Sequence, residues 1–317
     1  MDMRGGFLAL GWHLRRNSQN GAVAKSNLWP RQEKLAQAKL PLDQQSGLMF
    51  LVQANFLMRV QLLFPLLLLA LSHSFSAESV REMSTDRPDT TESAYSVPAG
   101  MVQIEMSFFD YSRDSNPGAV SEQWIYGQVN FKTGLSSDMD FQMIVNSHAI
   151  AGESERGDST RTSGFGDITL RLKKNLWGND QGSTALAIMP YVTVPTHTHV
   201  SEQAWSGGLI IPFAMTLSDR VSLGLMTEMD VVHDAATGGY DLEWLHSATL
   251  GFSFTEEWGA FIEVVGIAGQ DTSFQVLFDA GLTYAVTPEL VLDAGLRLGL
   301  NRAAPDIGLF TGMSVRF

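Results

Sequence analysis

Ionisable side chains fall on one face of several short predicted strands in this 317-residue sequence, two or four residues apart. In the segment 290–301, for example, Asp293 and Arg297 alternate with Leu292 and Leu296. Charges on one face of a strand can pair with each other or line a hydrated path, whereas unpaired charges are strongly disfavoured against lipid. The charged residues with this parity are Glu105, Asp140, Asp167, Arg171, Lys173, Glu228, Asp230, Glu263, Asp279, Asp293 and Arg297.

If the apolar positions face lipid, these residues line an enclosed interior that is hydrated or ion-paired. Lys132, Glu243 and Arg316 share their parity. Acidic members outnumber basic ones, which favours a path that tolerates cations or neutral solutes. A network of paired charges that holds the wall rigid would produce the same pattern, so both interpretations stay open.

Candidate catalytic residues do not form a convincing set. The sequence contains no Cys, which excludes thiolate catalysis and disulfides. His246 and Ser247 are neighbours of opposite parity, yet a nucleophile needs its base within hydrogen-bond reach. His197 and His199 supply only two of the three or four ligands that a zinc site uses. We therefore predict no enzyme, no cofactor and no metal; the less favoured alternative is an outer-membrane lipid hydrolase.

Alternation of apolar and polar residues predicts short strands, and no stretch of the chain forms a convincing amphipathic helix. Segments of about ten residues with one apolar face are typical of membrane-spanning strands. The predicted fold is an all-β, antiparallel, up-and-down transmembrane barrel of about twelve strands over residues 101–317. The predicted strands are 101–112, 123–134, 139–148, 165–177, 183–194, 205–217, 221–233, 241–254, 259–268, 274–286, 290–301 and 308–317.

The connections between these segments alternate in length. Short turns are predicted at 136–138, 178–182, 218–220, 255–258 and 287–289, and longer loops at 149–164 and 195–204. Outer-membrane barrels have short turns at the periplasmic end and longer loops outside the cell. Both ends of the barrel chain are then predicted to lie on the periplasmic side.

The last strand ends on Phe317, with Val315, Met313 and Leu309 on the same face. This ending resembles the closing strand of bacterial outer-membrane barrels, which the barrel-assembly machinery reads as a signal. The predicted partners are therefore outer-membrane lipid and this machinery. Phe109, Tyr111, Phe261 and Phe274 or its neighbours are predicted to face inward and to narrow a modest interior, so small molecules are the expected cargo.

The N-terminal part of the chain contains a predicted export signal. Residues 58–76 contain Arg59, the apolar run LLFPLLLLAL and then small residues, the layout of a signal peptide. We interpret residues 1–57 as a mis-called upstream extension; a disordered N-terminal arm is the alternative. The remaining chain has 13 basic and 31 acidic residues, a net charge of −18. Such a surface repels phosphates, so no nucleic-acid partner is predicted.

Residues 77–100 are polar and turn-rich, and we predict a periplasmic lead-in or lumen segment there. Arg87 lies between Asp86 and Asp89, and these three residues form a candidate motif for the periplasmic mouth. We expect the TDRPDTTES lead-in to fold into or against the periplasmic mouth and to pair with interior charges such as Arg171 and Lys173. A solvated leader is the alternative.

Two stretches carry a family resemblance: STDRPDTTESAYSVPAG at 84–100 and GFGDITLRLKKNLWGND at 164–180. Together with the terminal TGMSVRF they resemble the outer-membrane transporters of the phenol-degradation MetA-pathway family. The resemblance implies a β-barrel of the bacterial outer membrane that passes small, often aromatic or apolar, solutes, and it supplies no catalytic residues. A structural or adhesive barrel with a plugged lumen is the main alternative.

Overall fold

The computed structural model describes residues 7–8, 11–12, 81–235, 237–270 and 272–317. The predicted signal peptide, 58–76, lies outside the described residues. So does the predicted upstream extension, apart from β1 (Phe7–Leu8) and β2 (Gly11–Trp12), which pair with each other. The predicted lead-in is described from residue 81 onward.

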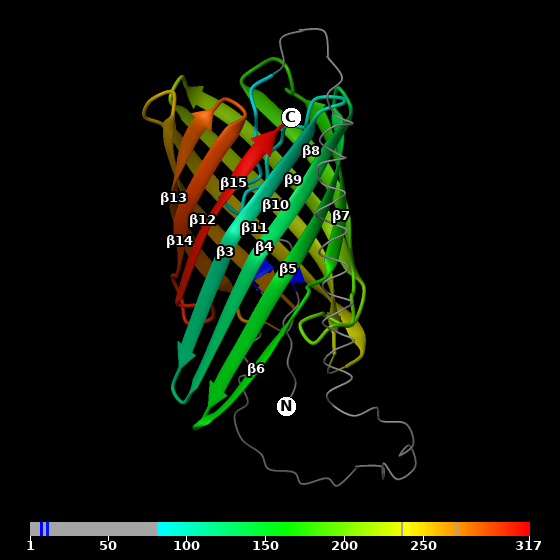
Figure 1. Cartoon of the computed structure of the whole chain (residues 1–317), viewed down its shortest axis with the longest axis vertical. Coiled ribbons are helices and arrows are strands. Elements are labelled where there is room, and N and C mark those ends of the chain that lie inside the picture. The colour runs from blue at the N-terminus through cyan, green and yellow to red at the C-terminus, as the bar shows by residue number, and fades with distance from the viewer. Residues whose placement is uncertain (1–6, 9–10, 13–80, 236, 271) are drawn as a thin grey trace, which may run out of the picture. The chain divides into compact units, whose positions relative to one another are not determined.

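The other strands form one antiparallel sheet that closes on itself, because β3 pairs with both β4 and β15 (Figure 1). β6 and β7 follow one another along β5, so thirteen strands occupy twelve positions around the barrel. The predicted all-β barrel of about twelve strands is therefore confirmed. The strands are β3 (Val102–Asn116), β4 (Ala119–Ser136), β5 (Met139–Glu155), β6 (Asp158–Gly164), β7 (Ile168–Trp177), β8 (Thr184–Val194), β9 (Ser206–Ser218), β10 (Val221–Asp234), β11 (Gly239–Ser253), β12 (Trp258–Gly269), β13 (Gln275–Thr287), β14 (Leu290–Gly299) and β15 (Ile307–Arg316).

The outer face of the barrel is apolar. Ile262 and Leu296 are 41% and 37% exposed, whereas their neighbours Glu263 and Arg297 are 1% and 3% exposed. This inverts the arrangement of a water-soluble domain and matches a barrel whose outer solvent is lipid. No helix in the described part of the chain is long and apolar enough to cross a membrane.

The barrel closes next to the C-terminus, where the N–H of Phe317 donates to the carbonyl of Val102 over 2.8 Å. The same end of the barrel holds the short turns, such as the one between β4 and β5. Short turns mark the periplasmic end of outer-membrane barrels, so we assign this end to the periplasm.

At the opposite end, the hairpins β3–β4 and β5–β6 reach beyond the other strands (Figure 1). The prediction of a long loop at 149–164 was wrong: Ala149–Glu155 pairs with Asp158–Gly164. This stretch is polar on both faces, so it lacks the alternation that identifies a half-buried strand. We call residues 109–126 and 148–164, the outer parts of these two hairpins, the arm.

A bulge changes the parity of β3. Phe108 is an extra residue on this strand, since β15 has none opposite it. Inward positions are odd-numbered up to Ser107 and even-numbered beyond the bulge, as expected for a one-residue insertion. Phe109 and Tyr111 therefore face outward, and their predicted inward orientation was wrong.

The two remaining aromatic residues also differ in orientation. Phe261 is buried on the inner face, opposite Gly281 of β13. Phe274 is exposed, and its ring lies beside Gly266, a position of outward parity. Residue 274 precedes β13 and follows the outward parity of that strand, so its neighbour Gln275 faces inward instead of Phe274.

The parity change can be tested cleanly because the chain has no native Cys. A fluorophore attached at Phe109→Cys is expected to be quenched by spin-labelled lipid, since the bulge turns this position outward. The matched variant Ser112→Cys, at an inward and buried position, is expected to resist such quenching. Stronger quenching at position 112 than at position 109 would contradict the assignment.

Candidate functional site

An extended segment, residues 81–100, runs into the barrel from its periplasmic end, and we call it the plug segment. Its two ends lie beside the periplasmic turns: Arg81 donates to the carbonyl of Ser137 over 2.7 Å, and Ala99 forms a bridge with Gly134. A Cβ at Gly134 would overlap the carbonyl of Pro98, so only glycine allows this close approach. The segment between these ends folds back on itself and contacts the inner wall.

Asp86 anchors the plug segment to one side of the wall. Nζ of Lys173 lies 2.7 Å from its Oδ1, and Lys132 forms an ion pair with its Oδ2. Lys132 also pairs with Glu105, whose carboxylate accepts the backbone N–H of Asp86 over 3.0 Å. The four side chains are at most 3% exposed. Charges withdrawn from water in this way are stable only when paired, so the cluster ties the segment to β3, β4 and β7.

Arg87 anchors the same turn of the segment to β14. Its Nε and Nη2 donate to the two carboxylate oxygens of Asp293 over 3.0 and 2.6 Å, and Nη1 donates to Ser107 over 2.5 Å. This bidentate geometry is the strongest that Arg makes with a carboxylate. Gly312 leaves the required space, because a Cβ there would lie 2.5 Å from Nη2 of Arg87.

The deepest part of the plug segment binds β11, β12 and β13. Glu263 accepts the backbone N–H groups of Thr90 and Thr91 over 2.7 and 2.8 Å. The Thr91 hydroxyl lies 2.7 Å from that of Ser247, and the Thr90 hydroxyl donates to Asp279 over 3.2 Å. Glu263 is five residues from the start of β12, which places these contacts about 16 Å along the strand from its periplasmic end.

A chain of contacts continues from the plug segment through β7 to β8 and β10. Arg171 donates to Glu92 over 2.5 Å, and its guanidinium lies 6.0 Å from the ring centroid of Tyr191. The Tyr191 hydroxyl donates to Asp230 on β10. Arg171 therefore joins the plug segment to β8 and β10.

The charged residues predicted to line the lumen all lie on inward positions. Those that contact the plug segment are Glu105, Asp140, Arg171, Lys173, Glu263, Asp279 and Asp293. Glu228 and Asp230 lie together on β10, while Arg297 pairs with Asp110 and Asp279. Of the predicted mouth motif, Asp86 and Arg87 make the contacts described above, and Asp89 lies beside Thr249 and Glu263.

Sequence reasoning missed Glu92, Thr90 and Thr91. The plug segment has no periodicity, so nothing in its pattern distinguishes side chains that bind the wall from those in solvent. The density of Asp, Glu, Thr and Ser in STDRPDTTES was the only available signal.

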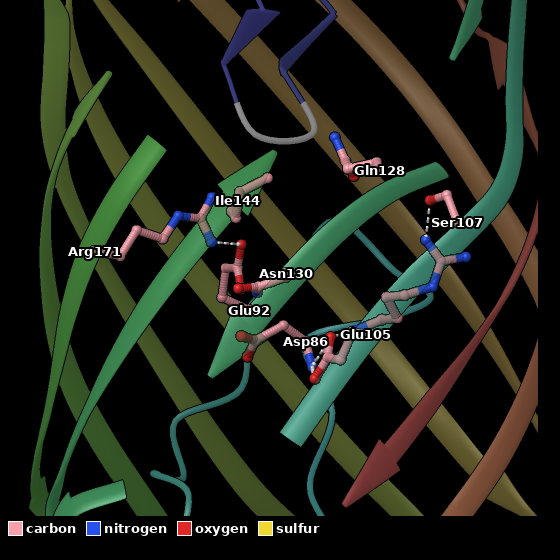
Figure 2. A pocket seen from close by; sticks show the side chains of 9 residues that line it. Asp86, Glu92, Glu105, Ser107, Gln128, Asn130, Ile144 and Arg171 are labelled. Atoms are coloured by element: carbon pink, nitrogen blue, oxygen red, sulfur yellow. Dashed lines mark hydrogen bonds and ion pairs between the residues drawn. The ribbon is translucent and has the colours of Figure 1, made fainter. Parts of the chain in front are cut away.

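Little space remains between the plug segment and β3, β4, β5 and β7. A cavity of about 30 Å³ lies here, bordered by Glu92 and Arg171 on one side and by Asp86 and Glu105 on the other (Figure 2). This volume is close to that of one water molecule. An aromatic solute does not fit this sector while the plug segment is in place.

A cluster of apolar side chains lies on the inner wall, where they pack against one another with exposures of at most 8%, next to the acidic Glu228 and Asp230 of β10. Its residues occupy inward positions on β8 to β13, from the level of the plug tip toward the outer end, and Met226 accepts the N–H of Glu92 over 3.3 Å. We call this set the apolar patch: Met189, Tyr191, Ile210, Met226, Leu245, Val265, Ile267 and Leu277. A hydrophilic pore does not need aliphatic side chains on its inner wall, so hydration of a pore does not explain the patch.

The loop 195–205 covers part of the outer end and is held by one carboxylate. Asp167 accepts the N–H groups of Thr196 and Glu202 over 2.8 and 2.9 Å. Burial, with a smaller contribution from Asp167 and Asp230, raises the pKa of Glu202 to about 7. Below that pH the carboxyl group is mostly neutral, so the loop then avoids burying another negative charge.

Fold and interior together define a bacterial outer-membrane barrel with an internal plug. The sequence matches the family described as "Putative MetA-pathway of phenol degradation" over residues 85–317, and the chain belongs to this family. No curated protein sequence matches the chain.

A solved structure supports the fold. The chain is similar to the COG4313 outer membrane channel from Pseudomonas putida F1, with 15% identity and a TM-score of 0.56, over 71% of this chain and 98% of that one. It is also similar to the CymD monoaromatic hydrocarbon channel, with 11% identity and a TM-score of 0.39, over 69% of this chain and 88% of that one.

Removing the carboxylate of Asp86 is expected to loosen the plug segment. Asp86→Ala leaves Lys132 with Glu105 and takes from Lys173 its ion pair with Asp86, and breaking a buried ion pair costs about 3 kcal/mol, or roughly a hundredfold in the open population. Proteolysis of residues 81–100 in the folded barrel should accelerate accordingly. The control is Asp138→Ala, which breaks the exposed pair with Lys174 at a periplasmic turn. Equal rates in the two variants would count against this anchoring.

Proposed function

We propose that this protein is an outer-membrane channel for small aromatic or apolar solutes, and that the plug segment controls passage. The observation that carries the proposal is the apolar patch inside a barrel whose other interior surfaces are charged. Apolar side chains on an inner wall favour a solute that gains from leaving water, whereas a hydrophilic solute gains nothing there. In the same proposal, residues 58–76 direct export and Phe317 serves the barrel-assembly machinery.

The two sectors of the interior have complementary tasks in this proposal. The charged residues hold the plug segment, and the apolar patch, whose members are at most 8% exposed in the plugged barrel, becomes a surface for the solute once the plug segment moves. The contacts at Thr90, Thr91 and Glu92 lie beside the patch, so a solute must displace or bypass the tip of the plug segment. Family membership supports the solute class, since the family description refers to phenol degradation.

The competing functions make different demands on these residues. A lipid hydrolase would need Ser247 beside a base, but its hydroxyl is bonded to Thr91 and the neighbouring His246 has the opposite parity. A purely structural or adhesive barrel would keep the plug segment in place permanently. It would use the buried apolar cluster only for packing, and it would pass no solute.

Solute flux tests the proposal. With the purified protein in liposomes, a small phenol is expected to enter faster than a sugar of similar mass. Leu277→Asn, which places an amide in the apolar patch, should slow phenol flux about tenfold, because burying an unpaired polar group costs about 1–3 kcal/mol.

The matched control uses adjacent positions of opposite parity on one strand. Val265→Thr changes the patch, whereas Val264→Thr makes the same change on the outer face, where Val264 is 47% exposed. Only the first should reduce phenol flux. A barrel that passes neither solute, or passes both at rates unaffected by the patch variants, would support a structural role instead.

A further inference from the structure

A groove of about 300 Å³ lies on the arm, outside the barrel interior. Its residues come from three neighbouring strands of the arm: Glu122 and Trp124 on β4, Ile150 and Gly152 on β5, and Ser159 and Arg161 on β6. The pairs Trp124–Ile150 and Glu122–Gly152 have the outward parity that follows the bulge. The groove therefore opens away from the solute path.

An aromatic cluster marks the membrane side of this groove. The ring centroid of Trp124 lies 4.2 Å from that of Tyr111, 6.0 Å from Tyr126 and 6.5 Å from Phe109. Outward aromatic residues of this kind gather at the level of the lipid headgroups. The groove starts at Trp124 and extends away from the cluster toward the tip of the arm.

Strand length agrees with this position. β4 has 18 residues and β5 has 17, whereas crossing the bilayer takes about 9–11. The surplus of about seven residues carries the arm roughly 20 Å along the strands beyond the apolar core. The groove thus lies where the outer leaflet presents its headgroups, and in the bacterial outer membrane these headgroups are the sugars of a glycolipid.

The floor of the groove is bare backbone between two opposite charges. Gly152 pairs with Glu122 on one side and with Arg161 on the other, so the charged residues are about 10 Å apart across the three strands. A Cβ at Gly152 would meet only the carbonyl of Glu122, at 3.9 Å, so the space above the glycine is open. This gap accommodates one six-membered ring.

Glu122 is held in position before any ligand arrives. The Tyr111 hydroxyl donates to its Oε1 over 3.0 Å, and Nε of Arg113 lies 3.9 Å from the same atom. Arg161 is exposed at the open edge of β6. Ser159 lies two residues before it on the same face of the strand and adds a hydroxyl group. The groove therefore presents a fixed acceptor, a charged donor, a hydroxyl and an aromatic end wall.

We propose that this groove binds one sugar ring of the glycolipid headgroup in the outer leaflet. The C–H face of the sugar packs against Trp124 and Ile150 above Gly152, while its hydroxyl groups bond to Glu122, Arg161 and Ser159. Ligand sites commonly combine an apolar surface with a few placed polar groups in this way. The site would anchor the arm to the membrane surface and is independent of solute passage.

Binding of purified lipopolysaccharide with a complete sugar core, and of its soluble deacylated core oligosaccharide, tests the proposal. Both should bind the detergent-solubilised protein, and lipopolysaccharide truncated to its lipid portion should bind more weakly. Gly152→Leu, which fills the groove, and Arg161→Gln, which removes the charged donor, should each weaken oligosaccharide binding about tenfold. The control is Trp258→Ala, which removes an exposed aromatic residue at the periplasmic end.

Folding of each variant is checked by the heat-dependent shift in gel mobility. If Gly152→Leu does not fold, Arg161→Gln at the exposed strand edge still decides the question. Unchanged oligosaccharide affinity in Arg161→Gln would overturn the proposal. Displacement of the oligosaccharide by a small phenol, or binding of the lipid portion alone with full affinity, would also overturn it.

Discussion

The closed state of this barrel depends on charge pairing around Asp86. Lys132 and Lys173 are buried on the inner wall, and the aspartate of the plug segment neutralises both of them. Without it, Lys132 would keep only its pair with Glu105 and Lys173 would lose its pair with Asp86, in an environment where an unpaired charge is costly. The interior charges therefore do not simply line a hydrated path. Most of them are the binding partners of a segment that lies earlier in the chain.

This pairing divides the interior into two sectors with different physical properties. The first sector is charged and filled by the plug segment, with space for about one water molecule. The second is the apolar patch on β8 to β13. The two sectors adjoin on β11 to β13, where the plug segment binds Ser247, Glu263 and Asp279, so the network of contacts that holds the plug and the proposed solute route lie beside each other in one barrel.

The strands of the barrel were predictable because each has a lipid-facing side, so Ile262 and Glu263 alternate as the two-residue period requires. The arm was not predictable in this way, since residues 153–161 are exposed on both faces. The predicted inward orientation of Tyr111 was wrong because one extra residue, Phe108, reverses which face of β3 the later side chains occupy. The amino-acid composition gives no sign of such an insertion. The contacts of the plug segment link residues up to about two hundred positions apart, as Arg87 and Asp293 do, and no local pattern contains that information.

The most direct test of the central claim is to tether the plug segment to the wall. The hydroxyl groups of Thr91 and Ser247 lie 2.7 Å apart, so the double variant Thr91→Cys/Ser247→Cys places two thiols together in a chain that has no other Cys. We predict that the oxidised protein passes no phenol into liposomes and that reduction restores the flux. Equal flux in the oxidised and reduced states would contradict control by the plug segment.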